Sequence, residues 1–329
     1  MVMPEALAHI MRTASGYTHA IPLLTACQTR IFAALGRERR SAGALARELG
    51  MDERALETVL LALVADGFLT GDEAGFALAP GYGEFLLPDG KRTRASILSH
   101  HAHLVPRWAR LPEVLRSGEP VVATQDRTPD ELRAFICGMA NLSRESSLEA
   151  AEKLNVGQYH RMLDLGGGPG TAAIVFARAN PELNAVVFDL PDPIEIAREE
   201  IAAAGLEDRI DTMAGDFMRD DIGADYDLVY IANIIHMLGP EETEALLRKA
   251  RAALVPGGTV AIKDFYLDDS RAAPNFAAFF SINMLVNTPR GKSYTRTEVE
   301  QLLTRLGFQD LALLSVAEES AILTARKGS

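Results

Sequence analysis

Two cysteines and no long apolar run set the first limits on this 329-residue chain. Cys27 and Cys137 form no C-x-x-C pair, so the sequence predicts neither a disulfide framework nor a zinc ribbon. No uninterrupted apolar stretch reaches the roughly 18 residues that a helical membrane span needs, so we expect no membrane partner. The N-terminus contains Glu5 and His9 and lacks an apolar signal core, and we therefore expect a cytoplasmic protein.

Positive charge is also scarce. Lysine and arginine total 33 against 45 aspartates and glutamates, which gives a net charge of −12. This balance repels phosphate backbones, so nucleic acid is not expected as the main partner. His100, His101 and His103 lie close together in a helix predicted at 96–116, but no cysteine or nearby carboxylate completes a ligand set. No metal site is predicted there.

The most informative stretch is 162–170, where a short apolar run ends in glycines and an alanine-rich helical pattern follows. This order predicts a buried strand, a tight turn and a helix start, which together bring backbone close to a nucleotide-like ligand. No lysine follows the glycines, so a nucleoside triphosphate loop is not expected. The next apolar run ends in Asp189, 23 positions after Gly166, where an acid can receive ribose hydroxyls.

The rest of the second half continues this alternation of strands and helices. Apolar runs and turn residues predict strands at 209–217, 225–233 and 255–264, helices at 240–254, 275–286 and 297–306, and an antiparallel hairpin from 311–315 and 321–325. The order resembles the S-adenosylmethionine-dependent methyltransferase fold, and a dinucleotide-binding Rossmann domain lacks the final hairpin. The expected fold class is therefore α/β, with a Rossmann-like class I methyltransferase sheet.

The resemblance implies S-adenosylmethionine as the cofactor and S-adenosylhomocysteine as its product. The cofactor-binding candidates that it marks stand at the predicted strand ends and turns: Asp164, Gly166, Gly168, Asp189, Leu190, Asp216, Phe217 and Asn233. In the helix predicted at 130–153, Phe135, Met139 and Ser143 recur at four-residue steps, as in the family helix that covers the cofactor. Met139 and Ser143 are therefore further candidates.

In the N-terminal part, apolar residues at three- and four-residue steps predict a long helical region at 6–35. Pro22 should kink or divide this region. Helices at 42–49, after a Ser41 cap, and 53–66 lead into a small hairpin, and this order resembles a winged helix. A DNA-binding regulator is one interpretation, although Arg54 is the only basic residue on the second helix. The other is the dimerisation domain of plant-type and microbial small-molecule O-methyltransferases, which the preceding helix resembles and which implies a homodimer.

His236 follows the predicted strand 225–233, where an imidazole can accept a phenolic proton near neutral pH. Its position matches the catalytic histidine of the O-methyltransferase family, and Asp264 matches the carboxylate that orients it. The chain departs from the family pattern in three places. Met237-Leu238 replaces the usual Asp-Trp, Ala232 replaces a lysine, and Ser293-Tyr294 stands where a second carboxylate normally follows. These departures leave open whether oxygen or carbon is methylated, and whether His236 is the base or has only a positional role.

The expected domains are a winged-helix dimerisation domain at 1–95, a helical region at 96–154 that lines the acceptor and cofactor sites, and a methyltransferase domain at 155–329. Acceptor-pocket candidates are Trp108, Phe276, Phe280, Met284 and Asn287, although apolar residues at helical spacing equally suit a core. The sequence thus predicts an O-methyltransferase acting on a hydroxyl of a hydrophobic, aromatic or polyketide-like small molecule. A C-methyltransferase on a related ring is the alternative, and the DNA-binding regulator is less favoured.

Overall fold

The computed structural model describes residues 4–72, 74–121, 129–316 and 319–328. The chain divides into two compact units, Met1–Pro106 with Thr128–Asn141, and Arg107–Arg127 with Leu142–Ser329. Two helices, α7 (Ala95–Trp108) and α9 (Pro129–Lys153), pass from one unit to the other. In α9, the side chains of residues 129–135, 137 and 139–142 lie outside the described part of the structure.

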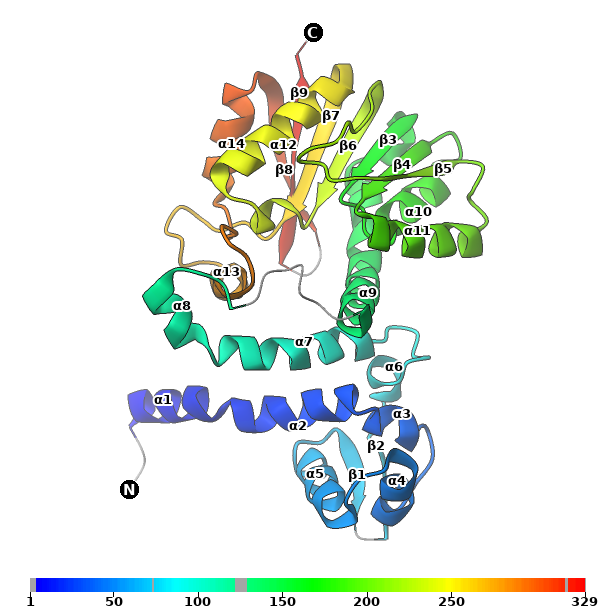
Figure 1. Ribbon diagram of the computed structural model, residues 1–329, viewed down its shortest axis with the longest axis vertical. Coiled ribbons are helices and arrows are strands. Elements are labelled where there is room, and N and C mark those ends of the chain that lie inside the picture. The colour runs from blue at the N-terminus through cyan, green and yellow to red at the C-terminus, as the bar shows by residue number, and fades with distance from the viewer. Residues whose placement is uncertain (1–3, 73, 122–128, 317–318, 329) are drawn as a thin grey trace. The chain divides into compact units, whose positions relative to one another are not determined.

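The first unit is mainly helical (Figure 1). It begins with α1 (Glu5–Ser15), α2 (Tyr17–Gln28), α3 (Ile31–Leu35), α4 (Ala42–Leu49) and α5 (Glu53–Ala65), and continues through β1 (Leu69–Asp72), β2 (Gly75–Leu78) and α6 (Gly83–Leu86). The predicted Ser41 cap is confirmed, because its side chain accepts a hydrogen bond from the Ala44 amide. The two strands pair antiparallel, and leucines and phenylalanines of α3, α4, α5 and β2 form a buried core.

Two of the predicted helices are divided differently in the structure. Pro22 lies inside α2, and the break in the 6–35 region falls at Gly16, where glycine is a weak helix former, and again at Arg30, whose φ of 63° is left-handed. The single helix expected at 96–116 is two helices, α7 and α8 (Leu111–Ser117), with the chain turning between them. Periodicity alone did not reveal these local turns, because the apolar pattern continues across them.

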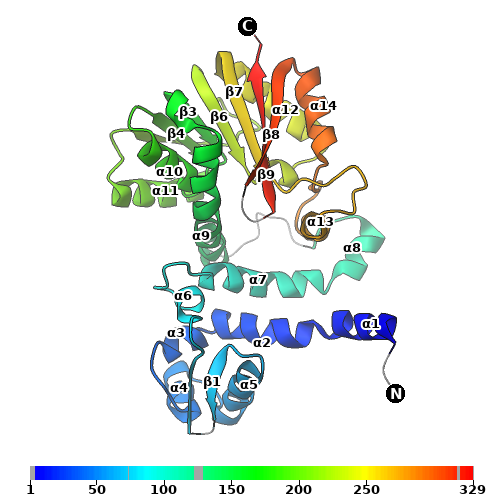
Figure 2. The same cartoon turned by 180° about the vertical axis from the view of Figure 1, so that it is seen from behind.

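The second unit is built on a seven-stranded sheet (Figure 2). Its strands are β3 (Arg161–Leu165), β4 (Asn184–Asp189), β5 (Ile210–Ala214), β6 (Tyr226–Ala232), β7 (Leu254–Asp264), β8 (Phe308–Val316) and β9 (Ser320–Lys327), in the order β5-β4-β3-β6-β7-β9-β8. The first five pair in parallel, whereas β9 is antiparallel to both β7 and β8. The predicted parallel sheet and C-terminal antiparallel hairpin are therefore confirmed.

Helices cover both faces of this sheet. On one face, α10 (Thr171–Ala179) and α11 (Pro191–Ala204) pack against residues such as Met162 and Val187, and on the other, α12 (Pro240–Ala253) and α14 (Arg296–Arg305) pack against their neighbours Leu163 and Phe188. Successive strand residues point to opposite faces, so apolar runs of this kind suit a sheet buried on both sides. The described residues of this unit also form α13 (Asn275–Asn287) and the short 3-10 turns η2 (Val156–Gln158) and η3 (Ile235–Met237).

Four neighbouring parallel strands, β5, β4, β3 and β6, end at the same edge of the sheet. In open α/β sheets this carboxyl edge is where ligands bind. Among the residues described, no helix is both long and apolar enough to cross a membrane.

Candidate functional site

The glycine-rich turn after β3 forms the floor of the candidate site. Gly166 and Gly168 have φ values of 72° and 54°, which glycine adopts without strain. A Cβ on Gly166 would overlap the Ile234 side chain. The Gly168 amide donates a 2.7 Å hydrogen bond to Oδ2 of Asp189 at the end of β4. The turn is thereby tied to the neighbouring strand, and a Cβ built on Gly168 would meet no other described residue within 4 Å.

Two acids face this turn from adjacent strand ends. Asp164 is buried at the end of β3, its Oδ2 accepts a 3.2 Å hydrogen bond from the Ala173 amide, and burial raises its pKa to about 7. Burial also raises the pKa of Asp189, whose Oδ1 accepts a hydrogen bond from the Leu190 amide. The Leu190 side chain is exposed beside it. Each carboxylate oxygen of Asp189 has a second lone pair, so it can still accept a hydroxyl.

The loop after β5 supplies the third part of the edge. Asp216 and Phe217 are half-buried here. Lys249 on α12 holds the loop by donating from Nζ to the carbonyls of Phe217, at 2.9 Å, and Asp220, at 2.7 Å. Lys249 was not predicted from the sequence, because its contact partners lie about 30 positions away in the chain.

Asn233, directly after β6, is the fourth part of the candidate site at this sheet edge. Its φ of 58° is left-handed, which asparagine tolerates better than most residues. Its amide donates to the carbonyl of Lys263 at 2.9 Å. Its Oδ1 atom is buried and accepts no hydrogen bond from the described residues. A buried acceptor of this kind at a ligand edge is suited to a donor on a bound molecule.

The strand-end candidates are thus brought together, and the two candidates on α9 belong to different units. Met139 belongs to the first unit, and its side chain lies outside the described residues. Ser143 belongs to the second unit, is half-buried, and accepts a 3.1 Å hydrogen bond at its carbonyl from the Ser146 hydroxyl.

His236 and Asp264 form a buried pair next to this edge. His236 lies on η3 and Asp264 ends β7, with 2.8 Å between Nδ1 and Oδ1 and side-chain exposures of 8% and 4%. Asp264 also accepts the backbone amides of His236, at 3.3 Å, and Phe265, at 2.8 Å. A carboxylate only accepts hydrogen bonds, so the proton of the neutral imidazole lies on Nδ1. Nε2 then carries a free lone pair.

Aromatic rings surround this imidazole. Phe280 lies edge-on to His236 at 4.8 Å between ring centroids, and Phe265 is stacked at 6.3 Å. Phe276 contacts both phenylalanines, at 4.9 and 5.9 Å. Phe276 and Phe280 were predicted from the sequence. Phe265 was not, although its position directly after Asp264 at a strand end was a usable signal. The three rings form an apolar cluster, the aromatic wall, beside this imidazole.

Of the other acceptor candidates, Met284 and Asn287 lie further along α13 and Trp108 ends α7. Trp108 donates from Nε1 to Oδ1 of Asn283 over 3.0 Å. Met284 and Asn287 are buried, and Arg107 donates from Nη1 to Oδ1 of Asn287 over 3.2 Å. Arg107 and Asn283 were not predicted from the sequence. Asn283 lies one helical turn from Asn287 and could have been found by that spacing.

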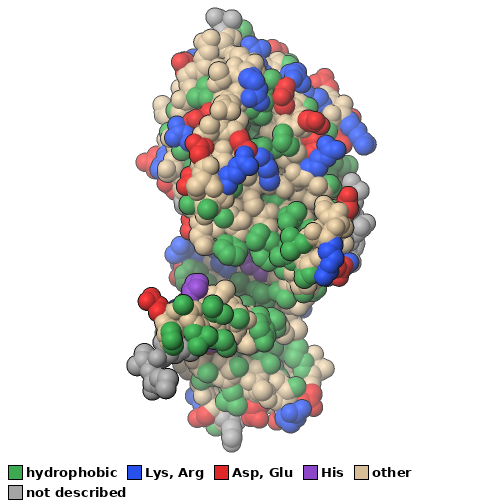
Figure 3. Space-filling view, turned by 90° about the vertical axis from the view of Figure 1, so that its left-hand side faces the viewer, with side chains coloured by type: hydrophobic (Ala, Val, Ile, Leu, Met, Phe, Trp, Pro, Cys, Tyr) green, Lys and Arg blue, Asp and Glu red, His purple; other side chains and the backbone are tan. Residues whose placement is uncertain are grey.

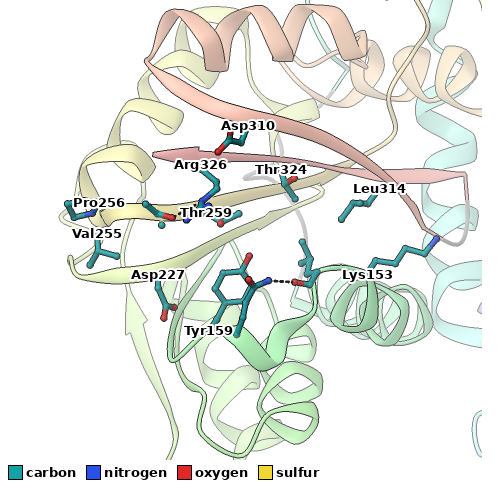
Figure 4. A pocket seen from close by; sticks show the side chains of 14 residues that line it. Lys153, Tyr159, Asp227, Val255, Pro256, Thr259, Asp310, Leu314, Thr324 and Arg326 are labelled. Atoms are coloured by element: carbon teal, nitrogen blue, oxygen red, sulfur yellow. Dashed lines mark hydrogen bonds between the residues drawn. The ribbon is translucent and has the colours of Figure 1, made fainter. Parts of the chain in front are cut away.

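A separate pocket of about 450 Å³ opens at the opposite, amino end of the parallel strands (Figure 4). Tyr159, Asp227 and Arg326 are among its lining residues. Asp227 already accepts the amides of His160 and Arg161, and Arg326 donates to the Gly257 carbonyl. None of the predicted site residues lines it. Among the described residues no group of three histidines, cysteines or acids could hold a metal ion.

Comparison with known proteins connects this geometry to one family. A family model described as an O-methyltransferase domain matches residues 116–309. The chain is 31% identical over 317 residues to a 3-hydroxy-5-methyl-1-naphthoate 3-O-methyltransferase of Streptomyces sahachiroi, covering 94% of this chain and 91% of the relative. It is 30% identical to an L-tyrosine C(3)-methyltransferase of Streptomyces lavendulae, with 92% and 86% covered. The crystal structure of human N-acetylserotonin methyltransferase in complex with S-adenosylmethionine has a similar fold, with a TM-score of 0.88, 24% identity and 99% of each chain covered.

Proposed function

The chain belongs to the O-methyltransferase family of S-adenosylmethionine-dependent enzymes, and we propose that it methylates a hydroxyl group of a hydrophobic, aromatic small molecule with His236 as the general base. The observation that carries the proposal is the buried His236–Asp264 pair inside a wall of phenylalanine rings. Asp264 fixes the orientation and tautomer of the imidazole, so that Nε2 is the proton acceptor. A hydroxyl on a flat aromatic acceptor would meet Nε2 while its ring packs on Phe265, Phe276 and Phe280.

The residues at the strand ends fit the cofactor. S-adenosylmethionine supplies an electrophilic methyl group on its sulfonium. Asp189 offers two carboxylate oxygens to the ribose hydroxyls, and the backbone of Gly166 and Gly168 allows close approach. We assign the same site to Asp164, Leu190, Asp216, Phe217 and Asn233, which stand at or directly after the ends of neighbouring strands of the same sheet edge. Met139 and Ser143 on α9 stay candidates from the sequence alone.

The chain's own residues then have two tasks in the reaction. The first is alignment, because an acceptor held at attacking distance converts a bimolecular step into an effectively unimolecular one. The aromatic wall, together with Trp108, Met284 and Asn287, is the proposed acceptor site. The second is proton removal, in which Nε2 of His236 takes the hydroxyl proton and Asp264 stabilises the resulting imidazolium.

Methylation of carbon is the second candidate, favoured by the 30% identity to a tyrosine C(3)-methyltransferase. Both reactions are helped by removal of the proton from the ring hydroxyl. They differ in whether the oxygen or the ring carbon lies in line with the methyl donor. The product therefore distinguishes them.

We further propose that the first unit is a winged-helix domain that forms a homodimer. In α1 no residue is buried, and Leu7, Ile10 and Met11 are 46%, 59% and 52% exposed. Figure 3 shows hydrophobic side chains gathered on this part of the first unit. An apolar helical face that its own chain leaves uncovered is typical of a subunit interface.

The test is incubation of the protein with methyl-labelled S-adenosylmethionine and a panel of phenols and hydroxynaphthoates, followed by mass-spectrometric location of the label. The proposal expects a methyl ether. A ring-methylated product would support the C-methyltransferase instead. Transfer to none of these acceptors by a protein that binds S-adenosylhomocysteine would contradict the proposed acceptor class.

A further inference from the structure

One face of α13 carries two aromatic rings followed by two amides. Phe276, Phe280, Asn283 and Asn287 are spaced by four, three and four residues, which places them along one side of the helix. The Phe280 ring lies edge-on to His236, at the aromatic end of this row. Because an α-helix rises about 1.5 Å per residue, Asn287 lies about 10 Å further along the axis than Phe280.

At the amide end, hydrogen bonds join α13 to the last two residues of α7. Asn287 donates from Nδ2 to the carbonyl and Oδ1 of Asn283, at 2.8 and 3.0 Å, and Trp108 donates to the same Oδ1. These contacts orient the Asn287 amide so that its own Oδ1 faces Arg107, whose Nη1 donates to it over 3.2 Å. The guanidinium is therefore positioned by an amide that is itself anchored.

Arg107 differs from the next arginine along the chain in its partner. In the described part of the structure its side chain makes one polar contact, to the neutral Asn287 oxygen, and it is half-buried. Arg110 instead pairs with the carboxylate of Glu113 at 2.7 Å. A guanidinium has five N–H donors in a planar fork, and a carboxylate fits two of them at once. Arg107 is thus a positive charge held in place and not neutralised by a described carboxylate.

We propose that Arg107, positioned by Asn287, binds a carboxylate group of the acceptor about 10 Å from the hydroxyl that faces His236. The inference rests on the proposed function, because it takes the His236 end as the point of methyl transfer. The acceptor class is then an elongated aromatic acid with its hydroxyl at one end and its carboxylate at the other. The aromatic wall contacts the rings between them.

Titration calorimetry on protein saturated with S-adenosylhomocysteine tests this subsite without requiring catalysis. The probes are 4′-hydroxybiphenyl-4-carboxylate, whose two groups are separated by the required length, and 4-phenylphenol, which has the same rings without the acid. The wild type should bind the acid at least tenfold more tightly. Arg107→Met should weaken binding of the acid about 10- to 100-fold, the range for a lost charge-assisted hydrogen bond, and change binding of 4-phenylphenol less than about twofold.

Arg107→Lys keeps the charge and loses the planar fork, so it should restore part of the preference for the acid. Arg110→Met, which removes a nearby exposed arginine, should bind both probes as the wild type does. Equal affinity of the wild type for the two probes, or equal loss of both in a folded Arg107→Met protein, would overturn the subsite. Preferential binding of the acid without methyl transfer to it would support the subsite and contradict the proposed function.

Discussion

Nδ1 of His236 lies 2.8 Å from Oδ1 of Asp264, and the backbone amide of the same histidine points at the other oxygen of that carboxylate. The pair joins η3, which follows β6, to the end of the adjacent parallel strand β7, and the hydrogen bond from the Asn233 amide to the Lys263 carbonyl links the same two segments. The orientation of the imidazole is therefore set by the sheet itself, and Nε2 is directed away from Asp264.

Asp189→Ala tests the ribose contact. Loss of charge-assisted hydrogen bonds, each worth about 1.5 to 3 kcal/mol, should weaken binding of S-adenosylhomocysteine at least tenfold. Titration calorimetry gives the dissociation constant. Asp192→Ala, which removes an exposed acid in the first turn of α11, is the matched control. An unchanged constant in the folded Asp189 variant would exclude this assignment.

Lys249→Met tests whether the hydrogen bonds from Lys249 to the loop after β5 contribute to cofactor binding. Without the bonds to the Phe217 and Asp220 carbonyls, the loop should be less ordered, and affinity for S-adenosylhomocysteine should fall about threefold to tenfold. The methyl-transfer rate at saturating cofactor should not change, because Lys249 contacts neither reactant. Arg248→Met, whose exposed side chain pairs with Glu244, is the control. Equal affinity of the wild type and both variants for S-adenosylhomocysteine would show that the Lys249 hydrogen bonds do not contribute to binding.

Much of this architecture could be predicted because its signals are local. The apolar run and glycines at 162–170 specify a strand and turn by themselves, and Ser41 caps the helix that begins at the next residue. The carboxyl-edge rule then brings Asp164 and Asp189 together without any further information. The glycine turn bonds directly to Asp189, as expected of such an edge.

The parts that could not be predicted depend on contacts distant in sequence. Arg107 meets Asn287 across 180 positions, and Lys249 meets the Phe217 carbonyl across 32. Neither residue belongs to a motif, and a lone arginine or lysine on a helix is ordinarily a solvated side chain. The break at Gly16 was missed for a different reason, since the apolar periodicity continues on both sides of it.

Asp164 should make the stability of the cofactor-free protein depend on pH. Burial raises its pKa from 3.8 to about 7, so between these values the folded state holds a proton that the unfolded chain has released. The free energy of unfolding should therefore fall as pH rises through this window, by up to about 1.4 kcal/mol per pH unit, and level off above about pH 7. Urea unfolding of wild type and Asp164→Asn at pH 5 to 8 measures this. Parallel curves for the two proteins would contradict it.

The dimer proposal is tested on α1, since truncation through Leu35 would also remove the buried Ile31 and Phe32 from the core. Ile10→Glu with Met11→Glu places two charges on the exposed apolar face and should convert a sedimenting dimer to a monomer. Leu61→Glu, an exposed leucine on α5, should leave the dimer intact. A wild-type protein that sediments as a monomer would contradict the proposal.

The central claim is that His236 removes the acceptor's proton, and single-turnover methyl transfer by His236→Gln measured from pH 6 to 9 tests it most directly. The glutamine keeps much of the volume and cannot take the proton, so the rate should fall about 10²- to 10⁴-fold while affinity for S-adenosylhomocysteine is unchanged. Asp264→Asn should lower the rate less, because it disturbs only the orientation and tautomer of the imidazole. Wild-type single-turnover rates in folded His236→Gln at every pH would contradict the account.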